Sequence, residues 1–374
     1  MILNGLNNFI KTNMNKILYT DLYSQYQEAK ASIDSAIKEV IQTSSFITGP
    51  MVDEFENTIK NYCGSDACAS IGSGTNALLC ALKAAGIGKG DEVITVSHTF
   101  VSTPETIINA GATPIFVDID DYYHIDINSI EYRITDNTKA ILFVDLYGQT
   151  PNITSLKTIA SHYNLILIED AAQSFGSKYK EKRVGSLVDL TCFSFNPVKN
   201  LGAMGDAGAV TGSKKLIDKV KMYRDHGRKT KYTYETVGYN ARIDNIQAKV
   251  IQAKLPYVDK WNKGRRQIAH TYTKELENII QTPIENQDSY HIYYVYAIQI
   301  EHRDSLQQHL KEAGIQTNIH YRTPTHKTSA FSKYSNNFLR NTEYGCERLL
   351  SLPVYHSLTE SNQQYIIDTI KNWL

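Results

Sequence analysis

The sequence predicts an α/β fold in which a mostly parallel sheet is covered by helices on both faces. Short apolar runs at residues 92–96, 113–117 and 140–145 lack the polar alternation of a half-exposed strand. Helical runs separate these strands, as at residues 104–110 and 153–163. Apolar strands joined by helices are typical of a parallel sheet. Because ligands of such sheets bind beyond the carboxyl ends of the strands, the functional residues are expected there.

The other elements follow from apolar spacing and turn residues along the chain. Helical spacing predicts helices, in chain order, at residues 26–43, 52–62, 77–85, 104–110, 153–163, 216–224, 246–263 and 303–313. Apolar or β-branched runs predict strands at residues 67–71, 92–96, 113–117, 140–145, 165–169, 191–195, 209–211 and 290–300, with an extended segment at 315–321.

The alternation of apolar strands and helices changes near residue 264, and this change predicts two domains. The large domain is expected over residues 14–263, and a smaller α+β domain over residues 264–374. Met14 begins a segment that resembles a natural start of the chain. Residues 1–13 are therefore predicted to be a disordered extension or the product of an upstream start codon.

Composition narrows the class of protein. Lys plus Arg and Asp plus Glu both number 39, so the formal net charge is zero and favours neither a nucleic acid nor a membrane surface as partner. No stretch approaches the roughly 20 apolar residues of a membrane span. The five cysteines are odd in number and form no C-x-x-C pair, which argues against a disulfide framework and a metal site. These features predict a cytoplasmic protein.

Two residues at predicted strand ends carry the main chemical signal. Lys199 follows the strand at 191–195 through a proline turn, and Asp170 directly follows the strand at 165–169. Enzymes that use pyridoxal phosphate (PLP) need such a pair, because the amine forms a Schiff base and the acid keeps the pyridine nitrogen protonated. A solvated lysine and a capping acid are the alternative, and spacing alone leaves both open.

A glycine-rich turn could hold a phosphate. Gly74 and Thr75 open the predicted helix at 77–85, where backbone N–H groups and the helix dipole favour an anion. The segment matches neither G-x-x-x-x-G-K-[ST] nor G-x-G-x-x-G, and simple helix capping is the alternative. Ser194 could add a hydroxyl to the phosphate, and Phe100 could stack on the cofactor ring, although ordinary core packing also explains a phenylalanine there.

A series of segments in register resembles the DegT-type sugar aminotransferases, a fold-type-I PLP family that acts on nucleotide-linked ketosugars. The similarity extends from about Ile17 to the C-terminus. The matching segments are residues 46–50, 72–78, 90–94, 99–100, 111–114, 116–118, 169–173, 194–208, 238–242, 314–315 and 320–321. The chain departs from the family pattern at Asn196, where an aromatic residue or His is common, and at Arg322, where Pro is common.

The resemblance implies a role for each matched residue. Lys199 is the Schiff-base lysine and also carries the proton between cofactor and substrate carbon. Asp170 pairs with the ring nitrogen, and Gln173 contacts the region of the ring hydroxyl. The remaining matches imply phosphate contacts from Gly74, Thr75 and Ser194, ring stacking by Phe100, a phosphate contact from the neighbouring subunit by Asn240, and proximity to the sugar nucleotide for His320 and Tyr321. The shared contact from Asn240 implies a homodimer.

By the same resemblance, the activity is transfer of an amino group from glutamate to a nucleotide-linked ketosugar. The glycine-rich segment at 200–209 is most similar to members that aminate C-3 of a dTDP-3-keto-6-deoxyhexose for deoxysugar pathways such as bacterial O-antigen synthesis. The alternative is C-4 amination of a dTDP-, UDP- or GDP-4-keto-6-deoxysugar. The chain could instead be a PLP-dependent sugar dehydratase, which carries His at the lysine position, or a non-catalytic protein. Lys199 argues against the dehydratase, and the presence of both Lys199 and Asp170 argues against a non-catalytic protein.

Overall fold

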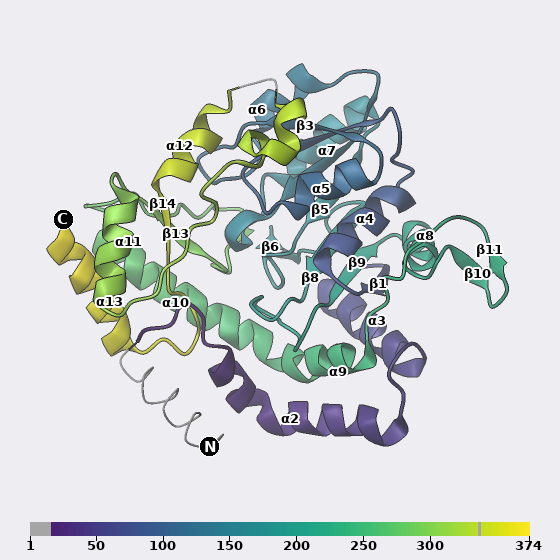
Figure 1. The fold of residues 1–374 in the computed structure, drawn as a ribbon, viewed down its shortest axis with the longest axis horizontal. Coiled ribbons are helices and arrows are strands. Elements are labelled where there is room, and N and C mark those ends of the chain that lie inside the picture. The colour runs from purple at the N-terminus through teal and green to yellow at the C-terminus, as the bar shows by residue number, and fades with distance from the viewer. Residues whose placement is uncertain (1–15, 336–337) are drawn as a thin grey trace.

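The computed structural model describes residues 16–335 and 338–374, so the prediction for residues 1–13 lies outside the described residues. A seven-stranded sheet occupies the centre of the molecule (Figure 1). Its spatial order is β1 (Ala67–Ile71), β9 (Gly208–Gly212), β8 (Leu190–Ser194), β5 (Ile166–Asp170), β4 (Thr138–Val144), β2 (Glu92–Val96) and β3 (Thr113–Val117). Only the pairings of β9 are antiparallel, which confirms the predicted mostly parallel sheet.

Helices cover both faces of the sheet because its strands are apolar on both sides. In β4, Ala140 and Leu142 point to one face, and Ile141 and Phe143 point to the other. The first face packs against α4 (Gly74–Ala84), α5 (Ser102–Asn109) and α8 (Lys214–Arg224). The second packs against α3 (Pro50–Cys63), α7 (Ile153–Tyr163) and α9 (Asn245–Lys254). This arrangement confirms the α/β class.

A separate apolar core forms toward the C-terminus. It is built from α10 (Val258–Leu276), β13 (Tyr296–Gln299), α11 (Arg303–Glu312), β14 (Leu349–Leu352) and α13 (Glu360–Trp373). Helix α10 runs without a break through the predicted boundary between residues 263 and 264. The side chain of Ile17 also packs into this C-terminal core. The domain boundary itself therefore stays a prediction.

The other elements are peripheral. They are α2 (Leu22–Thr43), α6 (Ile127–Ile130), β6 (Lys178–Tyr179), β7 (Lys182–Arg183), β10 (Arg228–Thr230), β11 (Thr233–Tyr234), β12 (Ser289–Tyr290), α12 (Arg340–Arg348) and five 3-10 turns at 131–133, 146–148, 255–257, 325–327 and 329–334. The β10–β11 hairpin projects from the body of the molecule (Figure 1). Among the described residues, every helix is too short or too polar to cross a membrane.

Two predicted elements were wrong in extent. The helix predicted at 246–263 is two helices, α9 and α10, separated by a 3-10 turn that contains Pro256, because proline lacks the N–H that a continuous helix needs. The strand predicted at 290–300 contains only the end of β12 and β13. Tyr293, between them, has a φ of 48°, which an extended strand cannot accommodate.

The strand directions place the predicted functional segments at one edge. β5 ends at Asp170 and β8, its parallel neighbour, ends at Ser194. The turn after β1 leads into α4 at Gly74 on the same edge, because β1 runs parallel to β8 across the antiparallel β9. The carboxyl edge of the sheet therefore carries the site.

Candidate active site

A cavity of about 510 Å³ opens at the carboxyl edge of the sheet. It is lined by every residue predicted for the site except Asn240: Gly74, Thr75, Phe100, Asp170, Gln173, Ser194, Lys199, His320 and Tyr321. These residues come from separate strand ends and from the loop that follows α11, so only the folded chain brings them together. Asn240 is exposed and is absent from the cavity wall formed by the described residues.

Asp170 is the last residue of β5 and is 5% exposed. Its Oδ2 accepts a hydrogen bond of 2.7 Å from the Thr103 hydroxyl, and its Oδ1 accepts one of 3.2 Å from the Ala172 N–H. Burial raises the pKa of Asp170, whereas these two donors and the charge of Lys199 lower it. The carboxylate is thus a buried acceptor with donors already fixed on both oxygens.

Lys199 stands on a turn that other elements hold in place. Its Nζ lies 4.7 Å from the centroid of the Tyr294 ring, which also lines the cavity. After it, the Asn200 side chain donates to Asn262 on α10 at 2.6 Å, and Lys254 on α9 donates to the Gly202 carbonyl at 2.5 Å. These anchors fix the backbone that carries the Lys199 amine.

The N-terminus of α4 and the end of β8 form a narrow cradle. A Cβ at Gly74 would lie 2.7 Å from the Ser194 Cβ, closer than real carbon contacts allow, so only glycine permits this approach. Ser73 caps α4 by accepting from the Asn76 N–H at 3.1 Å. The Thr75 hydroxyl lies 2.8 Å from the Ser102 hydroxyl. Backbone donors and hydroxyls at a helix N-terminus fit a phosphate.

Gln173 connects the sheet side of the cavity to its far wall, which is formed by His320 and Tyr321. Its Nε2 donates to the Tyr321 hydroxyl at 3.1 Å, and its Oε1 accepts from the Tyr147 N–H at 2.8 Å. The Tyr147 hydroxyl in turn donates to the carbonyl of His320. Tyr147 has a φ of 62°, in the left-handed region, which lets one residue contact both loops.

The electrostatics of the far wall follow from burial. Burial, and then the positive charge of Lys199, lower the pKa of His320 to about 4, so this imidazole is neutral at pH 7. Burial raises the pKa of Tyr321. The Phe100 ring lines the cavity, is 55% exposed, and its centroid lies 6.4 Å from that of the Tyr321 ring.

The two departures from the family pattern have different positions. Asn196 lines the cavity and donates to Asp206 at 3.0 Å. Arg322 makes two hydrogen bonds of 3.0 Å to Asp304. Its guanidinium is therefore paired away from the cavity, whereas Asn196 contributes directly to the wall.

Sequence reasoning missed three residues that the fold brings to the site, namely Thr103, Tyr147 and Tyr294. Thr103 lies one helical turn after Thr99, just beyond the strand predicted at 92–96, so that pair of threonines was a usable signal. Tyr147 follows β4, another strand that ends at the same edge. Tyr294 lies in the segment mistaken for a continuous strand, and no local pattern distinguishes it from its neighbouring tyrosines.

The donor set fits PLP. A buried carboxylate suits the protonated ring nitrogen, a lysine on an anchored turn suits the aldehyde, and the Gly74–Ser194 cradle suits the phosphate. The family model described as the DegT/DnrJ/EryC1/StrS aminotransferase family matches residues 27–371. The chain belongs to this family. The match confirms the resemblance found in the sequence, and this family member is a PLP-dependent aminotransferase.

Individual relatives cover almost the whole chain. A Geobacillus stearothermophilus protein named a pleiotropic regulatory protein is 41% identical, covering 94% of this chain and 96% of its own. A Streptomyces venezuelae dTDP-3-amino-3,4,6-trideoxy-alpha-D-glucose transaminase is 35% identical over 96% of each. The structure of NtdA from Bacillus subtilis, with the bound cofactor PMP, superposes with a TM-score of 0.90 at 30% identity, covering 96% of this chain and 85% of that one.

Proposed function

We propose that this family member transfers an amino group from glutamate to C-3 of a dTDP-3-keto-6-deoxyhexose. The observation that carries the chemistry is the single cavity in which Lys199, Asp170 and the Gly74–Ser194 cradle meet. The substrate is supported by the S. venezuelae relative, whose name specifies a dTDP-3-amino sugar. The product would enter deoxysugar synthesis in the cytoplasm, for example for a surface O-antigen.

The proposal gives each residue a physical task. When bound, PLP supplies an electron sink for the carbon that loses a proton. The Asp170 carboxylate holds the ring N–H, and the N-terminus of α4 with Ser194 binds the phosphate. Lys199 Nζ, which the turn holds over the cavity, takes a proton from one carbon and returns it to another.

The substrate is expected against the far wall. His320 is neutral and its ring nitrogens face Ser351 and Asn318, whereas Tyr321 is fixed by Gln173, so this wall is polar but carries no charge. Arg322 is paired with Asp304 and does not line the cavity, so we expect other residues to contact the sugar. Asn196, which lines the cavity where the family often has a larger ring, gives space for a sugar substituent.

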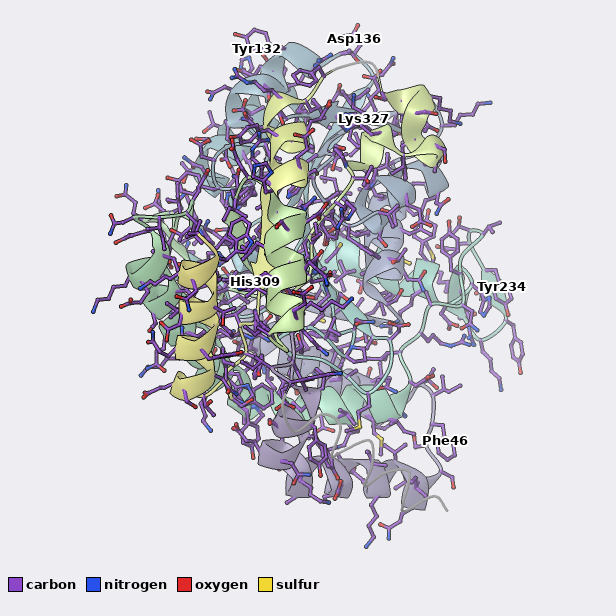
Figure 2. The ribbon with its side chains drawn as sticks, turned by 60° about the vertical axis from the view of Figure 1, so that its left-hand side comes forward. Phe46, Tyr132, Asp136, Tyr234, His309 and Lys327 are labelled. Atoms are coloured by element: carbon purple, nitrogen blue, oxygen red, sulfur yellow. The ribbon has the colours of Figure 1, made fainter. Side chains whose placement is uncertain are left out.

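We further propose a homodimer with shared sites. Asn240 is exposed and lies outside its own cavity, as expected of a residue that serves a second copy. Large apolar side chains are also exposed: Phe46 is 48% exposed, Val237 88% and Tyr234 62%. In Figure 2, Phe46 and the hairpin residue Tyr234 both project away from the body. Burying such side chains would stabilise an association.

Analysis of the product tests the substrate assignment. The enzyme is incubated with ¹⁵N-glutamate and either a 3-keto or a 4-keto 6-deoxysugar, each linked to dTDP, UDP or GDP, and the product is examined by mass spectrometry and NMR. Nitrogen at C-3 of the dTDP sugar is the expected result. Nitrogen at C-4 supports the C-4 alternative, a nitrogen-free deoxysugar supports a dehydratase, and unchanged sugars with an unreactive cofactor support a non-catalytic role such as the name of the Geobacillus relative suggests.

A further inference from the structure

We propose that Thr103 is a positioning residue that keeps Asp170 ionised and aimed at the cofactor ring nitrogen. This inference rests on the proposed role of Asp170. Thr103 lies in the first turn of α5 and is fully buried. It is absent from the cavity wall formed by the described residues, so it acts through Asp170 and not on a ligand.

The hydrogen bonds around Thr103 have a definite direction. An ionised carboxylate only accepts, so the Thr103 hydroxyl donates its single proton to Asp170 Oδ2 at 2.7 Å. The Thr99 hydroxyl, 2.8 Å from that of Thr103, must then donate to it. The two threonines form a buried chain that ends on the carboxylate, and each bond in such a chain polarises the next.

Asp170 needs this support because its surroundings disfavour its charge. Burial raises its pKa, and the only cation facing it among the described residues is Lys199. The acids around it, namely Asp145, Cys192 and Tyr321, have pKa values raised by burial. Apart from Thr103, the fixed donor to Asp170 is the Ala172 N–H at 3.2 Å. The Thr103 hydroxyl is therefore the stronger of two bonds that favour the charged form.

Removing the Thr103 hydroxyl should weaken the ion pair between Asp170 and the protonated pyridine ring of the cofactor. Thr103→Val keeps the shape of the side chain and loses the donor, so Asp170 is expected to bind a proton more readily. Affinity for the cofactor then falls at neutral pH. Because the ion pair needs an ionised Asp170, affinity for the cofactor falls as the pH drops through the Asp170 pKa. This fall is the acidic limb of the curve of affinity against pH, and it should move to higher pH in the variant.

Binding of pyridoxamine 5'-phosphate to the cofactor-free protein is the test, since this probe forms no covalent bond with Lys199. Affinity is measured by fluorescence titration from about pH 4 to about pH 9, so that the loss of binding on protonation of a carboxyl group can be followed from its ordinary pKa upward. Thr103→Val should weaken binding about tenfold or more at pH 7 and shift the acidic limb upward. Thr103→Ser, which restores the hydroxyl, should bind within about twofold of wild type.

Thr106→Val is the matched control. Thr106 is also fully buried on α5, but its hydroxyl donates to the Thr103 carbonyl at 3.0 Å and not to Asp170. It should lose thermal stability as Thr103→Val does, without a shift in the acidic limb. If Thr103→Val does not fold, Thr99→Val tests the same chain. Because Thr99 itself lines the cavity, the readout for this variant is the acidic limb alone, which should move in the same direction by a smaller amount.

Asp170→Asn distinguishes an error in the proposed role of Asp170 from an error in the role of Thr103 alone. If this variant binds pyridoxamine phosphate as wild type does, the proposed role of Asp170 is wrong and the inference falls with it. If Asp170→Asn weakens binding but Thr103→Val, or Thr99→Val in its place, leaves affinity and pH profile unchanged, the role of Thr103 alone is overturned.

Discussion

At the scale of single residues, the interior beside the site holds two carboxyl groups, Glu169 and Asp145. Both are fully buried; Thr191 donates to Glu169 at 2.7 Å and Ser174 donates to Asp145 at 2.7 Å. Burial raises the pKa of Glu169 to about 7 and also raises that of Asp145, which the Glu169 charge raises further. Asp145 Oδ1 and Glu169 Oε1 are buried without a partner, and a proton held by the pair would give these oxygens a donor.

This pair predicts a pH-dependent stability. The pKa of Glu169 is higher in the folded state, so its contribution to stability is fully present below about 4.5 and is lost as the pH rises through about 7. Glu169→Gln should therefore gain stability relative to wild type between pH 5 and pH 8, by about 1–3 kcal/mol. Urea unfolding of the cofactor-free protein at both pH values measures this difference.

Glu131→Gln, which changes an exposed acid, is the control and should show no such gain. A relative stability of Glu169→Gln that stays constant or falls with pH would mean that the pair is ionised in the folded protein.

At the scale of elements, the contact between α4 and β8 decides whether the phosphate cradle can form. An alanine at Gly74 would meet the Ser194 Cβ at 2.7 Å and its Cα at 3.4 Å, so the helix and strand must separate. Gly74→Ala should cost about 1–3 kcal/mol of stability and weaken PLP binding about tenfold. Thermal unfolding and a PLP titration measure both effects.

Gly88→Ala serves as the control, because a Cβ at Gly88 meets nothing within 4 Å. PLP affinity that is equal in the two variants would show that the close approach of α4 to β8 does not shape the phosphate site.

A second element-scale prediction concerns the loops that Tyr147 connects. Its hydroxyl donates to the His320 carbonyl and lies 2.9 Å from His98 Nε2. Tyr147→Phe leaves this carbonyl without its donor, which costs about 1–3 kcal/mol in a buried site. The KM for the ketosugar should rise about fivefold or more, while glutamate bleaches the absorbance band of the bound cofactor at the wild-type rate.

The neighbouring Tyr123→Phe is a matched control, because the Tyr123 ring packs 5.3 Å from that of Tyr147 but its hydroxyl bonds to Gln299 at 2.9 Å. A KM raised equally in both variants would indicate general loosening of the core in place of a specific connection to His320.

At the scale of the whole molecule, the shared site can be tested by mixing two damaged subunits. Lys199→Ala removes the amine and Asn240→Ala removes the proposed contact to the second copy. If Asn240 serves the partner, a mixed dimer holds one intact site, and random exchange restores about a quarter of wild-type activity. The mixture is assayed after denaturation and joint refolding, with each variant refolded alone as the control. Recovery no greater than that of the separate variants would place Asn240 outside the partner's site.

How far the sequence predicts this molecule depends on the range of the interactions involved. The strands at 67–71, 92–96 and 113–117 were predicted to the residue, because continuous apolar runs and flanking turns are local signals. Asp170 and Lys199, which the fold brings to one cavity, could be singled out because strand ends and a proline turn are also local signals. The hydrogen bond between Gln173 and Tyr321, which are 148 residues apart in the sequence, has no such local signal. Neither does the interruption at Tyr293, whose left-handed backbone is imposed by packing in the C-terminal core.

The proposed chemistry requires that Lys199 is the amine that bonds to PLP and moves the proton in amino transfer. The most direct test is the ultraviolet-visible spectrum of the purified protein with PLP, before and after glutamate, for wild type and Lys199→Ala. We expect a band of lysine-bound cofactor in wild type that glutamate bleaches to the amino form, and loss of that band in the variant. A wild-type-like band in Lys199→Ala that glutamate still bleaches at the same rate would show that another group carries this role.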